Sequence, residues 1–205
     1  MTEREKKDLH KYLDSANKEV SYILGHLDTE SLDKAADLIK QAKKHNNRVH
    51  ISGIGKPAHI AGYAASLMSS TGTPAYFLHG TEAVHGSCGQ LVKGDIVIFI
   101  SNSGETAEMK ATVLAVKNNG CKVIGISGNE DSWLSKESDV HLLAHVDEEG
   151  GPLNRAPRNS ILAETIVLQT LSVILQSDAD IDPEQYVKWH PGGSLGKLRD
   201  DEVKK

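Results

Sequence analysis

The chain has 205 residues, of which 39% are hydrophobic and 25% are charged, proportions typical of a soluble globular domain with its own core. This composition excludes a disordered chain, a collagen and a coiled-coil array. The formal net charge of −5 repels nucleic acid, anionic membranes and phosphate esters, so an anionic ligand needs a local site that overcomes this field.

Cysteine content and the apolar segments bear on the compartment. Two cysteines, Cys88 and Cys121, are too few for a disulfide framework. Residues 1–7 contain no apolar signal segment, and polar side chains interrupt the longest apolar run, residues 161–175. We therefore expect a cytoplasmic protein without a signal peptide or a membrane span.

The first elements in chain order are helices, and a sheet follows them. Apolar spacing predicts two helices within residues 3–45, the second beginning after Asp28 or Ser31. Short apolar runs then alternate with helical segments, which predicts a parallel sheet with helices on both faces. The expected strands are 49–51, 75–78, 96–100, 123–126 and 140–143. The linking helices are expected to begin near Pro57, Glu105 and Asp131, with a short one at 83–85.

The last long helix is expected at residues 159–176 and is apolar on more than one stripe. We interpret the surplus as a subunit interface, and the alternative is a central helix buried within one subunit. No internal repeat or linker divides the chain. One domain over residues 1–205 is therefore expected, with a helical arm at 1–46 and an α/β core with C-terminal helix and tail at 47–198.

Loops that follow the strands should carry the ligand site, because helix N-termini point outward at that edge of a parallel sheet. After the first strand, residues 52–58 satisfy G-x-G-x-x-A, which alone is weak support for a dinucleotide. Lys56 is followed by Pro57 rather than by the Ser or Thr of a Walker loop, and no acid ends the second strand. A nicotinamide cofactor is therefore disfavoured.

The third strand leads into the strongest local signal, Ser-Asn-Ser-Gly-Glu-Thr at residues 101–106. Three hydroxyls, a glycine and the N–H groups of a helix start make a neutral cradle for phosphate. A simple N-cap at Ser103 is the alternative, and it explains one hydroxyl of the three.

Charged side chains beside this cradle need a role or a partner. Glu105 would repel a phosphate unless a cation neutralised it, and Lys56 at the adjacent strand end is the expected partner. A second acidic group, residues 147–149, follows the last strand, where the alternative is a solvated loop.

Several of the ten histidines lie near these loops. His79, His85 and Cys88 suggest a metal by residue type, but their spacing matches no zinc pattern, and histidines that contact a sugar fit equally well. We expect no metal. His190 begins a glycine-rich segment, residues 190–196, that places an imidazole in a tight turn, and a plain turn that ends a helix is the alternative.

Together these segments resemble the sugar isomerase (SIS) domain family and, within it, the arabinose-5-phosphate isomerases. The resemblance covers about residues 10–198 in order, and the motifs that carry it are 53–56, 70–74, 79–86, 101–106, 152–153, 156–157 and 190–196. It implies a three-layer α-β-α sandwich with a five-stranded parallel sheet in flavodoxin-type order, a homo-tetramer with shared sites, and interconversion of an aldose 5-phosphate with its ketose. No cofactor is implied.

The resemblance also implies the site residues. The catalytic set would be Lys56, Glu105, Glu149 and His190. Substrate and phosphate would be bound by Ser52, Gly53, Gly55, His85, Ser101, Asn102, Ser103, Thr106 and Ser160. In the expected reaction Glu149 is the base, His190 opens the ring or moves protons between oxygens, and Lys56, oriented by Glu105, stabilises the oxyanion. The two glutamates could exchange roles.

Two departures from the family pattern affect these expectations. Many relatives carry a pair of CBS domains after the isomerase domain, whereas this sequence ends near where that module would begin, so no regulation through it is expected. Arg158 and Asn159 replace a hydroxyl-rich tract, which leaves the sugar open. The alternatives are an isomerase of a hexulose, heptose or amino-sugar phosphate and a non-catalytic phosphosugar sensor, for which no DNA-binding segment is visible.

Overall fold

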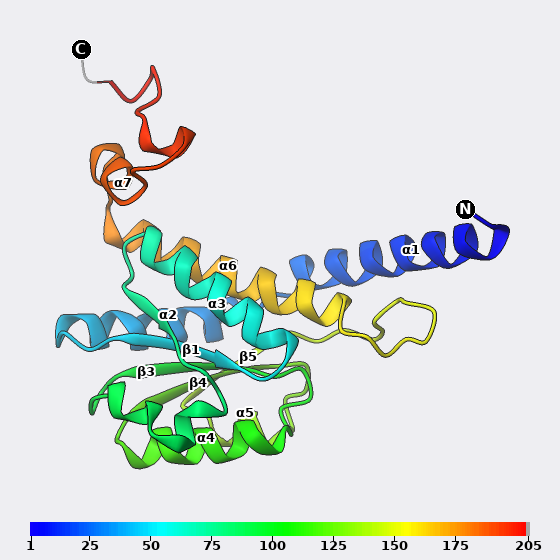
Figure 1. Cartoon of the computed structure of the whole chain (residues 1–205), viewed down its shortest axis with the longest axis horizontal. Helices are drawn as coiled ribbons and strands as arrows, with labels where there is room; N and C mark the ends of the chain where they lie inside the picture. Colours follow the sequence, from blue (N-terminus) through cyan, green and yellow to red (C-terminus); the bar gives the residue numbers. More distant parts are fainter. Residues whose placement is uncertain (204–205) are drawn as a thin grey trace.

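Five parallel strands form one sheet in the computed structural model, which describes residues 1–203 (Figure 1). The strands are β1 (Val49–Gly53), β2 (Ala75–Phe77), β3 (Ile96–Ile100), β4 (Lys122–Ser127) and β5 (Val140–Leu143). Their order is β2-β1-β3-β4-β5, and every neighbouring pair is parallel, which confirms the predicted sheet and its flavodoxin-type order. The strand order reverses direction at β1 and β3, the place where ligands bind in open parallel sheets.

Helices cover both faces of the sheet and complete the predicted three-layer sandwich (Figure 1). One layer holds α2 (Thr29–Lys44), α3 (Lys56–Ser70) and α6 (Asn159–Ala179). The other holds α4 (Ala107–Asn118), α5 (Trp133–Glu137) and the 3₁₀ helices η1 (Glu82–His85) and η2 (Ser87–Gln90). Because side chains alternate along a strand, Ile98 packs in the first core and its neighbour Phe99 in the second.

The first helix, α1 (Glu3–Gly25), is an arm that extends beyond the rest of the chain (Figure 1). Its inner half is held by polar contacts: Asn159 Nδ2 donates to Ser15 Oγ at 2.8 Å, and Lys18 Nζ donates to Asp147 Oδ2 at 2.9 Å. Its outer half exposes Leu9 and Leu13, which are 40% and 53% exposed. The arm is therefore fixed at the loop that follows β5 and free beyond it.

The apolar helix α6 packs within the chain against α1, α2 and α3. Its buried residues include Val167, Leu168 and Leu171, while Val173 is 65% exposed. Part of the apolar surplus is therefore covered inside one chain, while Ile161, Leu162, Ile166 and Ile174 are only half-buried, so the subunit interface stays a prediction. In residues 1–203 it is the one helix whose length and composition would suffice to cross a membrane, and 44% of its apolar stretch is buried inside the chain.

A further helix, α7 (Pro183–Trp189), and the 3₁₀ helix η3 (Ser194–Gly196) follow α6. The apolar spacing does not predict α7, although Asp182 followed by Pro183 is typical of a helix start. In the structure, Asp182 Oδ1 accepts a hydrogen bond from Gln185 N at 2.7 Å, and Pro183 occupies the first helical position. The helix ends at His190, as the plain-turn interpretation of that segment expects.

Candidate active site

The hydroxyl loop at residues 101–106 connects β3 to α4 at the C-terminal edge of the sheet. Gly104 N donates to Ser101 Oγ at 3.2 Å, and Ser101 Oγ lies 3.3 Å from Thr106 Oγ1. Ser103 Oγ accepts from Glu105 N at 3.2 Å, and Ser103 is exposed. No side chain caps α4, so the N–H groups of its first turn remain available to an anion. The N-cap is Thr106, not Ser103.

Glycine at residue 104 allows this loop to pack against α5. Its φ is +64°, and a Cβ there would lie 2.5 Å from Ser132 Cβ. Leu134 N also donates to Gly104 O at 3.1 Å. Asn102 is fixed in turn, because Gly128 N donates to its carbonyl oxygen at 2.9 Å. The predicted phosphate loop is therefore held by the backbone at both ends.

The loop after β1 brings the start of α3 to the same edge. Gly55 has a φ of +67° and is the N-cap, with no side-chain hydrogen bond, and Lys56 is exposed at the first position of the helix. At Gly53 a Cβ would lie 2.8 Å from Pro57 C, so only glycine lets the strand end approach the helix this closely. This segment contributes a second uncapped helix start and a lysine to the edge.

Ser52, predicted to bind substrate, is fully buried instead. Its exposed fraction is 0%, and its Oγ has no hydrogen-bond partner in the described residues. A Cβ on Gly80 would lie 3.4 Å from that oxygen, which places Ser52 beneath the loop that follows β2. Direct contact of Ser52 with a ligand is therefore wrong for this arrangement.

Glu105 does not contact Lys56, contrary to the prediction. Lys110 Nζ donates to Glu105 Oε2 at 2.5 Å, and Trp133 N donates to Glu105 Oε1 at 2.7 Å. These hydrogen bonds, that of Lys110 first, lower the pKa of the Glu105 carboxyl. The side chain thus joins the start of α5 to α4, because the loop geometry around residue 104 turns it toward that layer.

Glu149 caps the start of α6. Its Oε2 accepts from Arg158 N at 2.5 Å and from Ser160 N at 3.2 Å, and its own N–H donates to Asn154 Oδ1 at 2.6 Å. Two backbone donors at a helix N-terminus stabilise a negative charge. The Ser160 side chain, predicted to bind substrate, is 0% exposed, and its Oγ has no partner in the described residues.

The start of α3, which carries Lys56, and the start of α6, which is capped by Glu149, lie at one edge of the molecule. Gln169 Nε2 of α6 donates to Tyr63 OH of α3 at 2.9 Å, and further along Ser172 Oγ lies 3.4 Å from Thr71 Oγ1. The two helices therefore run in the same direction, side by side (Figure 1). With the hydroxyl loop, three of the predicted catalytic residues share the C-terminal edge of the sheet.

His190 is not with them. Its Nδ1 bonds to Tyr186 O at 2.8 Å, and its ring stacks on that tyrosine with centroids 4.0 Å apart. The neighbouring Trp189 faces the end of α3 and the start of β2, at the opposite edge of the sheet. The 21 residues of α6, about 30 Å of helix, separate the two ends. Within one chain, His190 therefore lies away from the other predicted catalytic residues, and its part in a site shared between copies stays a prediction.

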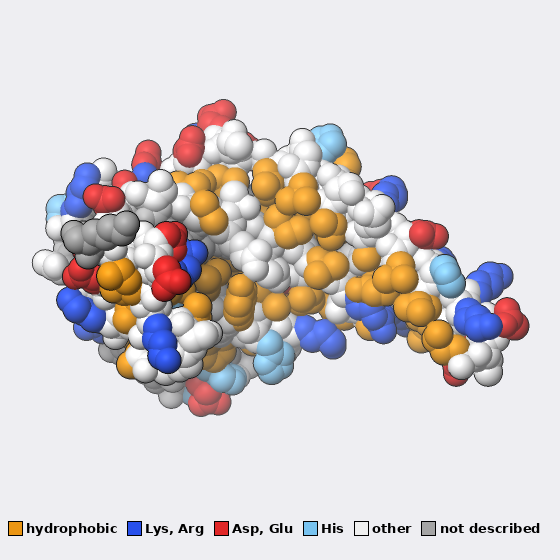
Figure 2. Space-filling view, turned by 90° about the horizontal axis from the view of Figure 1, so that it is seen from above, with side chains coloured by type: hydrophobic (Ala, Val, Ile, Leu, Met, Phe, Trp, Pro, Cys, Tyr) orange, Lys and Arg blue, Asp and Glu red, His pale blue; other side chains and the backbone are white. Residues whose placement is uncertain are grey.

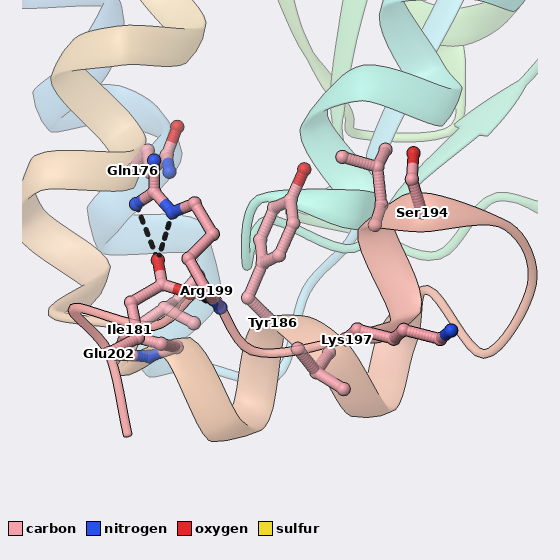
Figure 3. A pocket seen from close by; sticks show the side chains of 10 residues that line it. Gln176, Ile181, Tyr186, Ser194, Lys197, Arg199 and Glu202 are labelled. Atoms are coloured by element: carbon pink, nitrogen blue, oxygen red, sulfur yellow. Dashed lines mark hydrogen bonds and ion pairs between the residues drawn. The ribbon is translucent and has the colours of Figure 1, made fainter. Parts of the chain in front are cut away.

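A cavity of about 590 Å³ lies at this far end, between the end of α6, α7 and the tail (Figure 3). Gln176, Tyr186 and Lys197 line it, and Arg199 Nε donates to Glu202 Oε1 at 2.8 Å across one side. It is distant from the hydroxyl loop and contains none of the predicted site residues.

The histidines after β2 have modest roles. His79 Nδ1 accepts from Glu82 N at 3.3 Å, and His85 is exposed at the end of η1 without a hydrogen bond in the described residues. Within residues 1–203, no group of three or more His, Cys, Asp or Glu side chains is arranged to hold a metal ion. Whether His85 lines the ligand site stays a prediction.

Comparisons with known proteins agree with this geometry. The profile of the SIS domain matches residues 42–174. Arabinose 5-phosphate isomerase KdsD of Francisella tularensis is 37% identical over 168 residues, which make up 82% of this chain and 51% of that protein. Arabinose 5-phosphate isomerase KpsF of Escherichia coli is 36% identical over 171 residues, 83% of this chain and 53% of that protein. The chain spans about half the length of the curated relatives it matches.

A solved structure extends the similarity to three dimensions. The structure of an Escherichia coli CFT073 protein in complex with arabinose 5-phosphate superposes with a TM-score of 0.82 at 32% identity. The match covers 93% of this chain and 100% of that one. The fold of this chain is thus similar to that of a protein whose structure was solved with a sugar phosphate bound.

Proposed function

This chain belongs to the SIS domain family, and from that premise we propose that it is an aldose–ketose isomerase that converts D-arabinose 5-phosphate into D-ribulose 5-phosphate. The observation that supports the proposal is that the hydroxyl loop, Lys56 and Glu149 each follow the C-terminal end of a strand in one parallel sheet. Relatives named arabinose 5-phosphate isomerase and a structural neighbour in complex with that sugar phosphate support the choice of sugar.

Phosphate binding overcomes the net charge of −5 locally. Ser103 and Thr106 offer hydroxyls, and the first turns of α3 and α4 offer N–H groups that no side chain caps. Lys56 adds a positive charge at the same edge. An anion placed there gains from the helix dipoles as well as from hydrogen bonds.

Isomerisation then moves one proton between neighbouring carbons. Glu149 removes the proton from C2 of the open-chain aldose, and the electron pair forms a cis-enediolate whose negative oxygen is stabilised by Lys56. The Glu149 carboxyl group, whose proton can exchange with solvent, then gives a proton to C1, while a proton passes between the two oxygens, which yields the ketose. The reaction is redox-neutral within the sugar, so the proposal needs no cofactor and no metal. Glu105, bound to Lys110, supports the loop.

His190 enters this proposal from a second copy of the chain, in a homo-tetramer with shared sites. Its position at the far end of α6 leaves it outside its own chain's site. Hydrophobic side chains gather along the arm and over the helical layer of α3 and α6, where a second copy would cover them (Figure 2). They include Leu9, Leu13, Tyr63 and Val173.

The proposed setting is the cytoplasm, with a small sugar phosphate as the ligand and with neither nucleic acid nor membrane as a partner. Both cysteines are free thiols, which supports a reducing compartment.

An assay of isomerase activity tests this proposal. The purified chain is incubated with arabinose 5-phosphate in D₂O, and ketose formation and deuterium exchange at C2 are followed by NMR. A panel of pentose, hexose, heptose and amino-sugar phosphates run in parallel identifies a different preferred substrate. Tight binding of several sugar phosphates without exchange or turnover would instead establish the phosphosugar sensor.

A further inference from the structure

Glu164 is a buried carboxyl group that the proposed reaction does not use. It lies in the second turn of α6, its exposed fraction is 0%, and neither of its oxygens has a hydrogen-bond partner in the described residues. An ionised carboxylate without partners in an apolar interior is strongly disfavoured. The Glu164 side chain is therefore expected to be protonated, and so uncharged, in the folded protein.

The position of Glu164 connects it to the start of α6. Ser160 lies four residues earlier, on the same face of the helix, and its buried Oγ also has no partner in the described residues. Ser160 N donates to Glu149 Oε2 at 3.2 Å. Because neither Ser160 Oγ nor a Glu164 oxygen has a partner in the described residues, no hydrogen bond joins the two side chains, and Glu164 lies one turn after Ser160 on the same buried face.

The two glutamates occupy opposite environments. Glu149 accepts two backbone N–H groups at a helix N-terminus, which stabilises its charge. Glu164 has no donor, and burial, followed by the charge of Glu149, raises its pKa to about 8. Of the two, Glu164 is the carboxyl group that burial favours in its neutral form.

The other charged groups on the elements packed against α6 are engaged or exposed. On α1, Glu19 Oε2 accepts from Asp147 N at 3.1 Å, and Lys18 pairs with Asp147. On α2, Lys40 pairs with Asp178 at the far end of α6. Lys56 and His59 of α3 are exposed. Glu149 is the charge that acts on Glu164.

We propose that Glu164 keeps its proton in the folded protein and is a positioning residue for Glu149, because it fills the buried space one turn below the backbone N–H groups that hold Glu149. The role in catalysis rests on the proposed function, in which Glu149 is the base. The protonation itself does not, because it follows from burial and the missing partners.

Unfolding as a function of pH tests the protonation without any substrate. Urea unfolding of wild type and Glu164→Gln is compared from pH 5 to pH 9 at one protomer concentration. The folded form holds a proton that the unfolded form releases, so stability present at low pH is lost as the pH rises. Relative to the variant, the wild-type unfolding constant should rise about tenfold per pH unit and level off near pH 8. Identical slopes would overturn the proposal.

Removal of the neighbouring charge tests the link between the two residues. In Glu149→Gln, Glu164 ionises more easily, so the pH at which the stability levels off should move to a lower value. Should this pH stay in place, the two residues are not coupled and the positioning role is wrong. Glu164→Leu provides a second uncharged reference if Glu164→Gln folds poorly.

Kinetics test the effect on Glu149. Glu164→Leu should lower kcat about tenfold with KM changed less than about twofold, and Glu164→Gln, which keeps the shape and polarity of the neutral acid, should restore most of the loss. Wild-type kcat in Glu164→Leu would reduce the residue to a structural role. A wild-type chain without turnover would overturn the proposed function, and the unfolding comparison would still decide whether Glu164 holds a proton.

Discussion

Lys110 and Glu105 form an ion pair in which Nζ lies 2.5 Å from Oε2. Trp133 N occupies the other oxygen, so the Glu105 carboxylate links α4 to the start of α5. Glu149 is held at the start of α6 by backbone N–H groups alone. The partners of the two acids therefore distinguish Glu105, which joins α4 to the start of α5, from Glu149, which the proposed function assigns as the base.

Glu149→Gln should lower kcat by about 10²–10⁴-fold, because an amide cannot accept the substrate proton. Glu105→Gln should lower it less and should reduce thermal stability. Both are measured by initial rates and by thermal unfolding. Full turnover in Glu149→Gln together with loss of turnover in Glu105→Gln would reverse the assignment of the base.

His190→Ala and Glu149→Gln should each be inactive alone and regain activity when the two chains are co-expressed and purified as mixed oligomers. Each mixed oligomer contains interfaces at which an intact His190 meets an intact Glu149. Rates are compared with those of the separately purified variants. An active His190→Ala, or a mixture that stays inactive, would contradict the shared site.

Ser103→Ala should raise KM about 10- to 150-fold with a smaller change in kcat, since a hydrogen bond to a charged phosphate is worth roughly 1.5–3 kcal/mol. Inhibition by inorganic phosphate should weaken in parallel. Ser177→Ala, on an exposed position at the far end of α6, is the matched control and should change neither value. A KM unaffected by Ser103→Ala would remove this hydroxyl from the phosphate site.

Gly53→Ala should destabilise the fold by about 1–3 kcal/mol, because the added Cβ would meet backbone atoms of Pro57 and Ala58 at 2.8 to 3.0 Å. Gly62→Ala, in the middle of α3, meets nothing within 4 Å and should stabilise by up to about 1 kcal/mol. Chemical unfolding measures both. Equal stability of the two variants would show that the close approach after β1 is not required.

His50 on β1 should make the protein less stable in mild acid. Its Nε2 lies 3.3 Å from Asp95 Oδ2, yet burial is the larger influence and lowers its pKa below 6.5. The unfolded chain therefore binds the proton first, and stability is lost as the pH falls below about 6.5. His50→Gln should flatten this dependence in thermal unfolding between pH 5 and 7. His45→Gln, at an exposed position, should leave it unchanged.

Much of the fold follows from the sequence, because strands with continuous apolar runs and helices with one apolar stripe are local signals. Two helix starts differ from the prediction. The helix expected near Asp131 begins at Trp133, since Ser132 Oγ accepts from Ser135 N, and the helix expected near Glu105 begins at Ala107, where no side chain caps it. Both starts depend on the conformation of the preceding loop, which apolar spacing does not predict.

The candidate site, too, could be predicted from the sequence only in part. The hydroxyl loop and Lys56 are adjacent to strand ends, so their meeting follows from topology. The partner of Glu105 and the distance of His190 depend on how loops turn and how helices are placed, which spacing does not encode. Glu164 carried a signal that could have been used, because it is the one acid inside the apolar run of residues 161–175.

The two halves of the helix α1 have different roles. Its inner half supports the segment that carries Glu149, through Ser15 and Lys18, and its outer half presents Leu9 and Leu13 to whatever covers them. In the proposed tetramer, the surface that a second copy covers and the contacts that support the proposed base therefore lie on one helix. Dilution that separates the copies should lower the activity of each remaining chain, so that specific activity depends on protein concentration.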